Sequence, residues 1–302
     1  MEISLPEHEA RIWEERVYER MTPLVRAPEL VRQTTKGWFI ARFLRPQAHE
    51  RVLDVGCGLG EFSLLCAGQA REVLGVDASP TAVAAARCAA NELGIANVSF
   101  MEGDVYELTK IAGEPDSFDK IVCFDLLEHL SDPENVLEQI HALLRPGGRA
   151  LAYTNCYGRF SARYLHEWLN TGGQVGELWG IDRRDHHLVR FTPQRLRAMT
   201  AAWRSRFVYK SHWLIPAVSW LIGLLDRLRP TSLPKLAAVS PPEEKPVCRV
   251  QQTMSKPRRW LQTLSYLVSV FEMETLGRLV PGAGVYLLLE KRASVAEGEK
   301  TR

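Results

Sequence analysis

Three glycines, Gly56, Gly58 and Gly60, directly follow the apolar run 52–55 in the stretch VLDVGCGLG. Glycine inside a strand or helix costs roughly 0.5–1 kcal/mol relative to alanine, so this cluster indicates a backbone that turns tightly or closely approaches another group. A turn of this kind between a strand and a helix presents main-chain N–H groups to a ligand. Such turns serve nucleotide-like ligands at the carboxyl ends of strands in doubly wound sheets.

Three carboxylates accompany the loop: Asp54 inside the first apolar run, Asp77 at the end of the second and Asp104 after the third. The glycine spacing differs from the dinucleotide pattern G-x-G-x-x-G, and Glu61 at the helix start would repel a pyrophosphate. Asp77 is placed to accept hydrogen bonds from ribose hydroxyls. Asp104 could accept from an adenine amino group, and Asp54 could lie near a cationic group. The set suits a positively charged nucleoside such as the sulfonium S-adenosylmethionine (AdoMet).

Strands and helices alternate around this loop. Strands are predicted at 51–55, 72–76, 97–102, 118–124, 149–155, 205–213 and 284–292. Helices between the earlier strands begin at Ser79-Pro80 and Asp132-Pro133, which are typical N-cap and first-turn pairs. Strands separated by helices predict parallel βαβ units.

Five segments together resemble the class I AdoMet-dependent methyltransferases. They are VLDVGCGLG, VLGVDAS, MEGDV, FDKIVCFDLLEHLSDP and LLRPGGRALAYTN, in this order within residues 51–155. DLLEHLSDP, the pair TN at 154–155 and HHLVRFTPQRL are similar to the ubiquinone-biosynthesis O-methyltransferase group. The resemblance implies an α/β fold with a Rossmann-like, doubly wound, seven-stranded sheet. This sheet would be mostly parallel with an antiparallel last strand, and helical elaborations would stand at both ends of the chain.

The resemblance also implies that AdoMet is the cofactor and which residues hold it. These residues are Lys36, Asp54, Gly56, Cys57, Gly58, Gly60, Asp77, Ala78, Asp104, Val105, Phe124 and Asp125. Lys36 stands where the group has an arginine, and it could pair with the AdoMet carboxylate. Structural roles stay open for Asp77 as a helix-start carboxylate, for Asp104 as a turn residue, for Phe124 as a core aromatic and for Lys36 as a surface lysine.

Methyl transfer to a hydroxyl needs positioning and help in removing a proton, from a base or a metal. His129, at the end of the fourth strand, and His187, before the helix at 191–203, are the candidate bases. The related group has a metal arrangement that Asp125, Glu128 and His129 match in place, with a shorter first acid. We assign no metal ligand, because Glu128 and His129 could equally satisfy backbone groups at the following helix.

The additions to the core should set specificity. We expect an N-terminal helical cap at 1–45, a cofactor-binding core at 46–212 with a substrate lid at 156–190, a helical insertion with a Pro-rich linker at 213–280, and the final core strand at 281–292. The apolar segments 213–225 and 260–271 are too short to cross a bilayer. They could contact a membrane surface peripherally, or they could cover the substrate or a partner subunit. The oligomeric state stays open.

Composition limits the classes of partner and the cellular location that we expect. A net charge of +2 over 302 residues gives no expectation of nucleic acid, and the six cysteines contain no CxxC pair. Neither a zinc site nor a disulfide framework is therefore expected, and no signal peptide is visible, so we expect a cytoplasmic protein that could associate with a membrane surface. Tyr106 and Lys110 have the spacing of a dehydrogenase pair but follow the third strand, too early for that arrangement.

The expected function is methyl transfer from AdoMet to a small-molecule acceptor, most simply at oxygen. Quinone-like, lipid-like and sugar acceptors fit the aromatic additions. Two alternatives remain: a non-catalytic protein that binds AdoMet or S-adenosylhomocysteine, and an RNA or protein methyltransferase.

Overall fold

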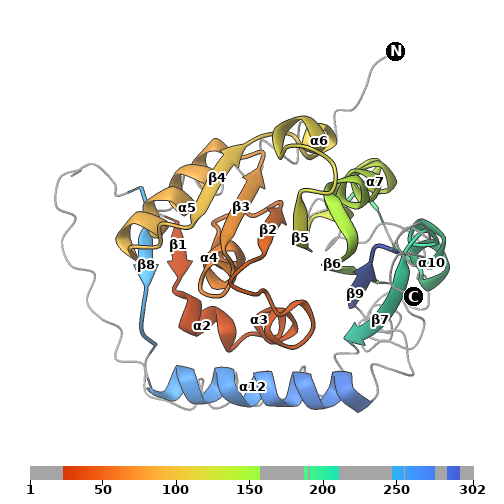
Figure 1. Cartoon of the computed structure of the whole chain (residues 1–302). Helices are drawn as coiled ribbons and strands as arrows, with labels where there is room; N and C mark the ends of the chain where they lie inside the picture. The colour runs from red at the N-terminus through yellow and green to blue at the C-terminus, as the bar shows by residue number, and fades with distance from the viewer. Residues whose placement is uncertain are drawn as a thin grey trace, which may run out of the picture.

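A seven-stranded sheet forms the centre of the computed structural model, which describes residues 23–156, 187–189, 191–210, 247–254, 256–275 and 284–292. Its strands are β2 (Arg51–Val55), β3 (Glu72–Asp77), β4 (Val98–Glu102), β5 (Phe118–Phe124), β6 (Leu144–Asn155), β7 (Arg204–Lys210) and β9 (Gly284–Glu290). They lie in the order β4-β3-β2-β5-β6-β9-β7 (Figure 1). Every pairing from β4 to β6 is parallel, and β9 is antiparallel to both β6 and β7. The predicted fold class, with an antiparallel last strand, is confirmed.

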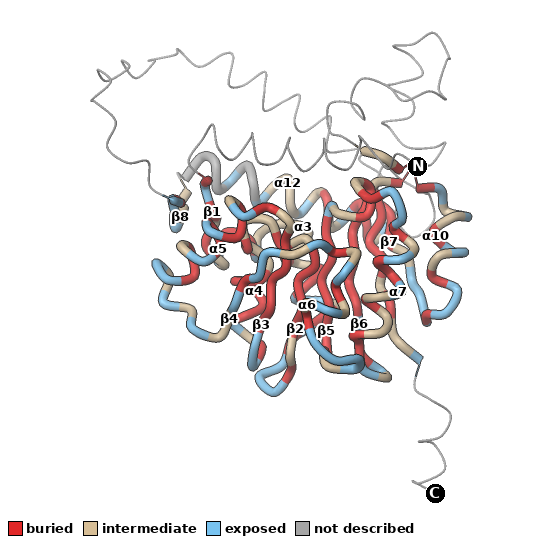
Figure 2. The backbone as a smooth tube through the Cα atoms, turned by 90° about the horizontal axis from the view of Figure 1, so that it is seen from above, coloured by how far each residue is buried: buried red, intermediate tan, exposed pale blue. Residues whose placement is uncertain are grey.

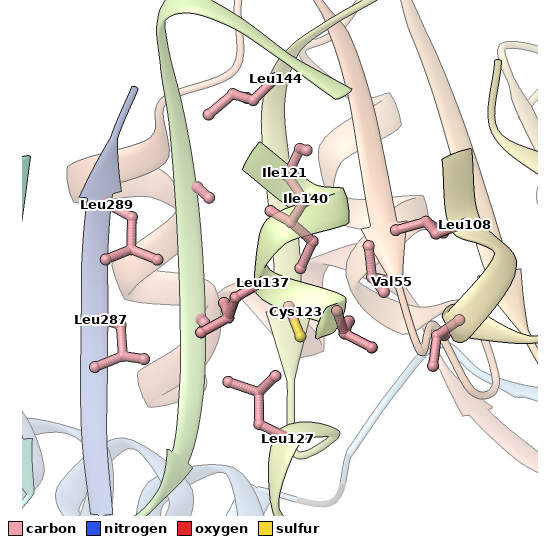
Figure 3. Packing of buried hydrophobic residues seen from close by; sticks show 14 of the residues in the cluster. Val55, Leu108, Ile121, Cys123, Leu127, Leu137, Ile140, Leu144, Leu287 and Leu289 are labelled. Carbon is pink, nitrogen blue, oxygen red and sulfur yellow. The ribbon is translucent and has the colours of Figure 1, made fainter. Parts of the chain in front are cut away.

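Alternating residues of the strands fill two cores on opposite faces of the sheet. Leu53 and Ile121 belong to the first core, whereas Val52 and Val122 belong to the second. This alternation follows from the two-residue period of a strand. Figure 3 shows the first core, where Ile140 of α7 (Pro133–Leu143) packs among strand side chains.

Helices cover both faces. α6 (Leu108–Ile111), α7 and α10 (Pro193–Met199) pack on the first core. On the other side lie α3 (Thr35–Phe39), the π-helical turn η1 (Ile40–Leu44), α4 (Glu61–Ala67) and α12 (Lys256–Thr275) (Figure 2). α5 (Pro80–Glu92) packs near β4 in a third cluster. Both faces of the sheet are therefore covered, as a parallel sheet requires.

The predicted helix starts have the expected caps. The Ser79 hydroxyl accepts from Ala82 N at 3.2 Å and the Asp132 carboxylate accepts from Asn135 N at 3.1 Å. Proline follows each cap at the first helical position, where its missing N–H costs nothing. These local signals fix where α5 and α7 begin, and thereby where β3 and β5 must end.

A small parallel sheet was not predicted. β1 (Leu24–Arg26) lies within the segment 1–45 that we expected to be a helical cap, and it pairs with β8 (Arg249–Gln251). α2 (Pro28–Arg32) and α3 follow it. The Arg26 Nε donates to both carboxylate oxygens of Glu61 at 2.9 Å, and the Arg26 main-chain N–H donates to one of them at 2.8 Å. Glu61 therefore ties the N-terminal segment to α4, and because its charge is paired it opposes a pyrophosphate less than we expected.

The long helix α12 contains the apolar segment 260–271. It contacts α3 and β7, and Met273 is buried in the second core. Its apolar stripe faces outward, because Trp260 is 63%, Leu267 55% and Phe271 63% exposed. Among the described helices, none is long and apolar enough to cross a bilayer. The segment 213–225 and the lid at 156–190, apart from Cys156 and residues 187–189, lie outside the described residues.

Candidate functional site

The glycine loop joins β2 to α4 at the carboxyl end of the sheet. Gly56, Gly58 and Gly60 have φ values of 68°, 51° and 76°, in the left-handed region where glycine is favoured. The main-chain N–H groups of Gly56 and Cys57 both donate to Val76 O, at 2.8 and 3.0 Å. The loop is therefore closed over the end of β3. Cys57 itself is buried beneath it.

Gly58 and Gly60 differ in the space that a side chain would have at each position. A Cβ on Gly60 would lie 2.7 Å from the Phe100 ring and 2.8 Å from Ala86 Cβ, so this glycine allows α4 and α5 to pack closely. A Cβ on Gly58 would meet nothing within 4 Å. Gly58 thus borders open space, whereas Gly60 serves the core.

Asp77 fixes the open side of the loop. One carboxylate oxygen accepts from Gly58 N at 2.7 Å and the other accepts from Ser79 N at 2.9 Å. The side chain is buried, and Ala78 beside it is half-buried. A carboxylate has about four lone-pair sites, so one oxygen can accept more than one hydrogen bond.

Asp54 lies on β2, two residues before the loop. It is buried and accepts a hydrogen bond of 2.6 Å from the Ser63 hydroxyl of α4. Burial raises the pKa of Asp54 to about 7; the Ser63 hydrogen bond opposes this shift, and the charge of Asp77 adds to it. Its geometry is that of a group that holds α4 to β2, and its predicted contact with the cofactor stays a prediction.

Asp104 and Val105 differ in exposure. Asp104 is exposed and accepts from Tyr106 N at 3.0 Å as the cap of the turn η2 (Val105–Glu107). Val105 is buried in the first core. Asp104 therefore has the turn role that was left open for it. It lies two residues after the end of β4.

Lys36 reaches the carboxyl end of β5 from α3. Its ammonium forms an ion pair with Asp125, which has a φ of 52° directly after β5. The Lys36 Nζ lies 4.9 Å from the Tyr153 ring centroid and 5.6 Å from that of Phe124. Phe124 is buried and makes an edge contact with Phe62 at 4.9 Å between centroids. A cation at this position is attracted by the aromatic faces.

Two further charged groups adjoin this ion pair and were not predicted. Lys210 ends β7 and Glu272 is buried on α12. Burial lowers the pKa of Lys210 to about 8; the nearby Lys36 charge also lowers it, while Asp125 and Glu272 oppose the shift. The sequence offered no signal for them, because they enter the site from elements more than 170 residues from α3.

The two predicted bases lie together. His129 ends the turn η3 (Leu127–His129), and its ring centroid lies 5.0 Å from that of His187. The Asn155 amide nitrogen lies 3.1 Å from His187 Nδ1 and 3.3 Å from Nε2. The Asn155 amide thus lies within hydrogen-bonding distance of the His187 ring. Asn155 ends β6, so three segments converge on one corner of the sheet.

Glu128 lies beneath the two histidines. It is buried and accepts a 2.8 Å hydrogen bond from the Thr154 hydroxyl. Burial raises the pKa of this carboxyl, and the Asp125 charge adds to the shift. Ligand atoms of Glu128, His129 and His187 all lie within 4.8 Å of one another. The resemblance implied that Asp125 would be the third member of this cluster. Among the described residues, Asp125 instead pairs with Lys36, and His187 is the third member.

The two loop glycines predict opposite effects of substitution. Gly60→Ala should lower the free energy of unfolding by roughly 1–3 kcal/mol because its Cβ overpacks the core. Gly58→Ala should keep most of the stability but weaken AdoMet binding at least tenfold, because the methyl group would occupy the open side. Urea denaturation and calorimetry measure the two effects. Gly94→Ala, which has a φ of 66° and open space around it, controls for backbone strain alone. Equal losses of stability at 58 and 60 would contradict the assignment.

Asp54 predicts a pH-dependent stability. Its pKa is about 7 in the folded protein against 3.8 as the ordinary value. The folded state therefore retains a proton that the unfolded chain loses, so this contribution to stability is full at low pH and is lost as the pH rises through about 7. In wild type, this carboxyl should lower the free energy of unfolding by up to about 4 kcal/mol between low pH and about pH 8, and Asp54→Asn should remove that decrease. Urea denaturation from about pH 4 to 8, with exposed Glu114→Gln as control, tests this; parallel curves for wild type and Asp54→Asn would refute it.

Comparison with known proteins places these residues in a family context. Residues 46–189 match the family model described as a methyltransferase domain. The chain is 38% identical over 109 residues to the ubiquinone biosynthesis O-methyltransferase of Xylella fastidiosa, covering 36% of this chain and 43% of that protein. It is 26% identical over 178 residues to the enzyme of the same name from Acinetobacter baylyi, covering 57% and 74%. The first of these matches thus spans less than half of the relative's length.

Solved structures agree on the fold. A phosphoethanolamine N-methyltransferase of Haemonchus contortus in complex with phosphomonomethylethanolamine and S-adenosylhomocysteine has a TM-score of 0.54 at 16% identity, covering 85% of this chain and 52% of that chain. At this identity the likeness concerns the fold alone. The family match agrees with the sequence motifs: residues 46–189 match the methyltransferase domain family, and the solved structure shows the same fold.

Proposed function

We propose that this chain binds AdoMet at the glycine loop and transfers its methyl group to an oxygen of a small-molecule acceptor. The observation that carries the proposal is the pairing of Gly58 with Asp77. The left-handed backbone at Gly58 borders open space, and the Asp77 carboxylate is held beside it by two main-chain N–H groups. This is a preformed acceptor for the two ribose hydroxyls of the cofactor.

The remaining cofactor contacts follow from this position. Asp104 would accept from the adenine amino group, with Val105 beneath the ring. Lys36 would leave or share Asp125 to pair with the AdoMet carboxylate, since its ammonium already lies among the rings of Phe62, Phe124 and Tyr153. The same aromatic faces favour a sulfonium, because ring quadrupoles attract cations.

His129 is the better of the two candidate bases. The Asn155 amide occupies a ring nitrogen of His187, which makes His187 a positioning residue beside His129. His129 would accept the acceptor hydroxyl's proton as the oxygen attacks the methyl carbon and the sulfonium becomes a neutral thioether. The buried Glu128 would support the resulting imidazolium, because a nearby carboxylate stabilises a cation in a poorly solvated site.

The acceptor class is drawn from the relatives and the additions to the core. The relatives are named O-methyltransferases of ubiquinone biosynthesis, which favours a phenolic, quinone-like acceptor over a sugar. An acceptor with an apolar tail also suits the exposed stripe of α12. A nucleic acid is not favoured, since the net charge is +2 over the whole chain.

Turnover tests this function. Purified protein should convert AdoMet to S-adenosylhomocysteine with at least one member of a panel of phenols, catechols and lipid-like hydroxyl compounds. His129→Gln should lower kcat by about 10²–10⁴ with little change in AdoMet affinity, because a base acts on the proton transfer alone. The matched control is His141→Gln, because His141 lies on α7 and its ring packs against that of Trp203. AdoMet binding without any turnover would instead support the non-catalytic alternative.

Contact with a membrane surface through α12 is part of the proposal. Trp260, Leu267 and Phe271 present an exposed apolar stripe at helical spacing, and the sequence just before it contains Lys256, Arg258 and Arg259. Co-sedimentation with vesicles that contain anionic lipid should therefore retain the protein at low salt. The double variant Trp260→Ser/Phe271→Ser should release it, whereas Thr263→Ser should not. If the protein does not co-sediment with the vesicles at low salt, the proposed membrane contact is wrong.

A further inference from the structure

A second cluster of ligating side chains lies outside the methyl-transfer site. Cys88 and Glu92 stand one turn apart near the end of α5, and Cys248 precedes β8. The Cys88 and Cys248 sulfurs each lie 3.9 Å from Glu92 Oε1. One ligand atom from each residue falls within 4.8 Å of the other two.

We propose that Cys88, Glu92 and Cys248 bind a thiolate-preferring divalent cation, with zinc as the best match. Zinc takes Cys sulfur at about 2.3 Å and carboxylate oxygen at about 2.0–2.2 Å in a tetrahedral arrangement. Neighbouring ligand atoms around such an ion are roughly 3.5–3.8 Å apart. The observed 3.9 Å separations therefore need a contraction of only a few tenths of an ångström. Water would supply the fourth ligand, because Glu92 is exposed.

The mixed burial of the three residues suits this role. Cys248 is buried, Cys88 is half-buried and Glu92 is exposed. Burial, together with the neighbouring Cys88 and Glu92, raises the pKa of Cys248 to about 12. A divalent cation would reverse this effect, since it binds the thiolate and releases the proton. Binding should therefore weaken as the pH falls.

A cation here would fasten the later part of the chain to the cofactor domain. Residues 247–251 would be joined to α5, and β8 pairs with β1. Arg26 of β1 is bonded to Glu61 in the first turn of α4, directly after the glycine loop. Cys248 also shares a buried cluster with Val25, Leu64 and Phe100. The site thus joins β8 and α5 next to β1, which is bonded to the helix that follows the glycine loop.

The sequence analysis did not predict this group, because it considered only cysteine pairs with CxxC spacing. Cys248 and Glu92 are 156 positions apart, so no CxxC or similar signature marks them. Only the pairing of β8 with β1 brings residue 248 to the end of α5. A disulfide between the two cysteines is the competing chemistry, but it would give Glu92 no part.

Cadmium titration of the reduced, chelator-treated full chain tests the proposal. We expect one equivalent to produce an ultraviolet thiolate-to-cadmium charge-transfer band, which zinc then removes by competition, together with proton release in weakly buffered solution. Cys88→Ser and Cys248→Ser should each abolish most of the band. Cys66→Ala, a buried cysteine of the second core, should keep it. His129→Gln should also keep it, which separates this site from the histidines.

Glu92→Gln covers the case in which a cysteine variant fails to fold, because its side chain is exposed. It should retain the band but weaken cadmium affinity at least tenfold, whereas Glu114→Gln should not. Three outcomes would overturn the proposal: no charge-transfer band in the folded reduced protein, a band that survives both cysteine substitutions, or an intact mass that shows a Cys88–Cys248 disulfide and no bound cation under reducing purification. None of these depends on whether the methyltransferase site turns over.

Discussion

The hydrogen bonds from Gly58 and Ser79 to one buried carboxylate hold the functional end of this molecule together. Asp77 stands at the end of β3, yet it fixes the loop that follows β2, so two neighbouring strands share one acceptor. The left-handed glycines allow the loop to reach that carboxylate, and the close approach at Gly60 sets how near α4 and α5 can lie. Because these constraints meet at one side chain, the geometry of the ligand-facing surface follows from the sheet itself.

Segments from across the chain meet at the carboxyl end of β5. α3 contributes Lys36, the sheet contributes Asp125 and Tyr153, and the later elements contribute Lys210 and Glu272. Two ammonium groups and two carboxylates in a partly buried place are costly unless they balance. The seven-stranded sheet supplies Asp125 after β5, Lys210 on β7 and the Tyr153 ring. Lys36 and Glu272 come from α3 and α12, outside the sheet.

Much of the core could be predicted because its signals are local. The cap at Ser79, the cap at Asp132 and the apolar strand residues each act within a few positions. Together with the family resemblance they predicted a seven-stranded, mostly parallel sheet with an antiparallel last strand. The individual roles were harder to predict. Asp54 accepts a hydrogen bond from Ser63, and Glu61 is paired with Arg26. Such partners are set by tertiary contacts at separations of tens of residues, which no spacing rule contains. The same reason hid Lys210, Glu272 and the pairing of β1 with β8.

The insertion of β9 between β6 and β7 has a consequence for how the chain folds during synthesis. β7 is the edge strand and pairs with β9, and Tyr286 of β9 is fully buried with its ring stacked on Phe39 at 3.6 Å. Until residues 284–290 have left the ribosome, β7 cannot join the sheet and the apolar surface around Phe39 stays open to water. A nascent chain of this protein therefore exposes part of its second core during synthesis, and such exposed hydrophobic surface favours aggregation until β9 pairs with β6 and β7.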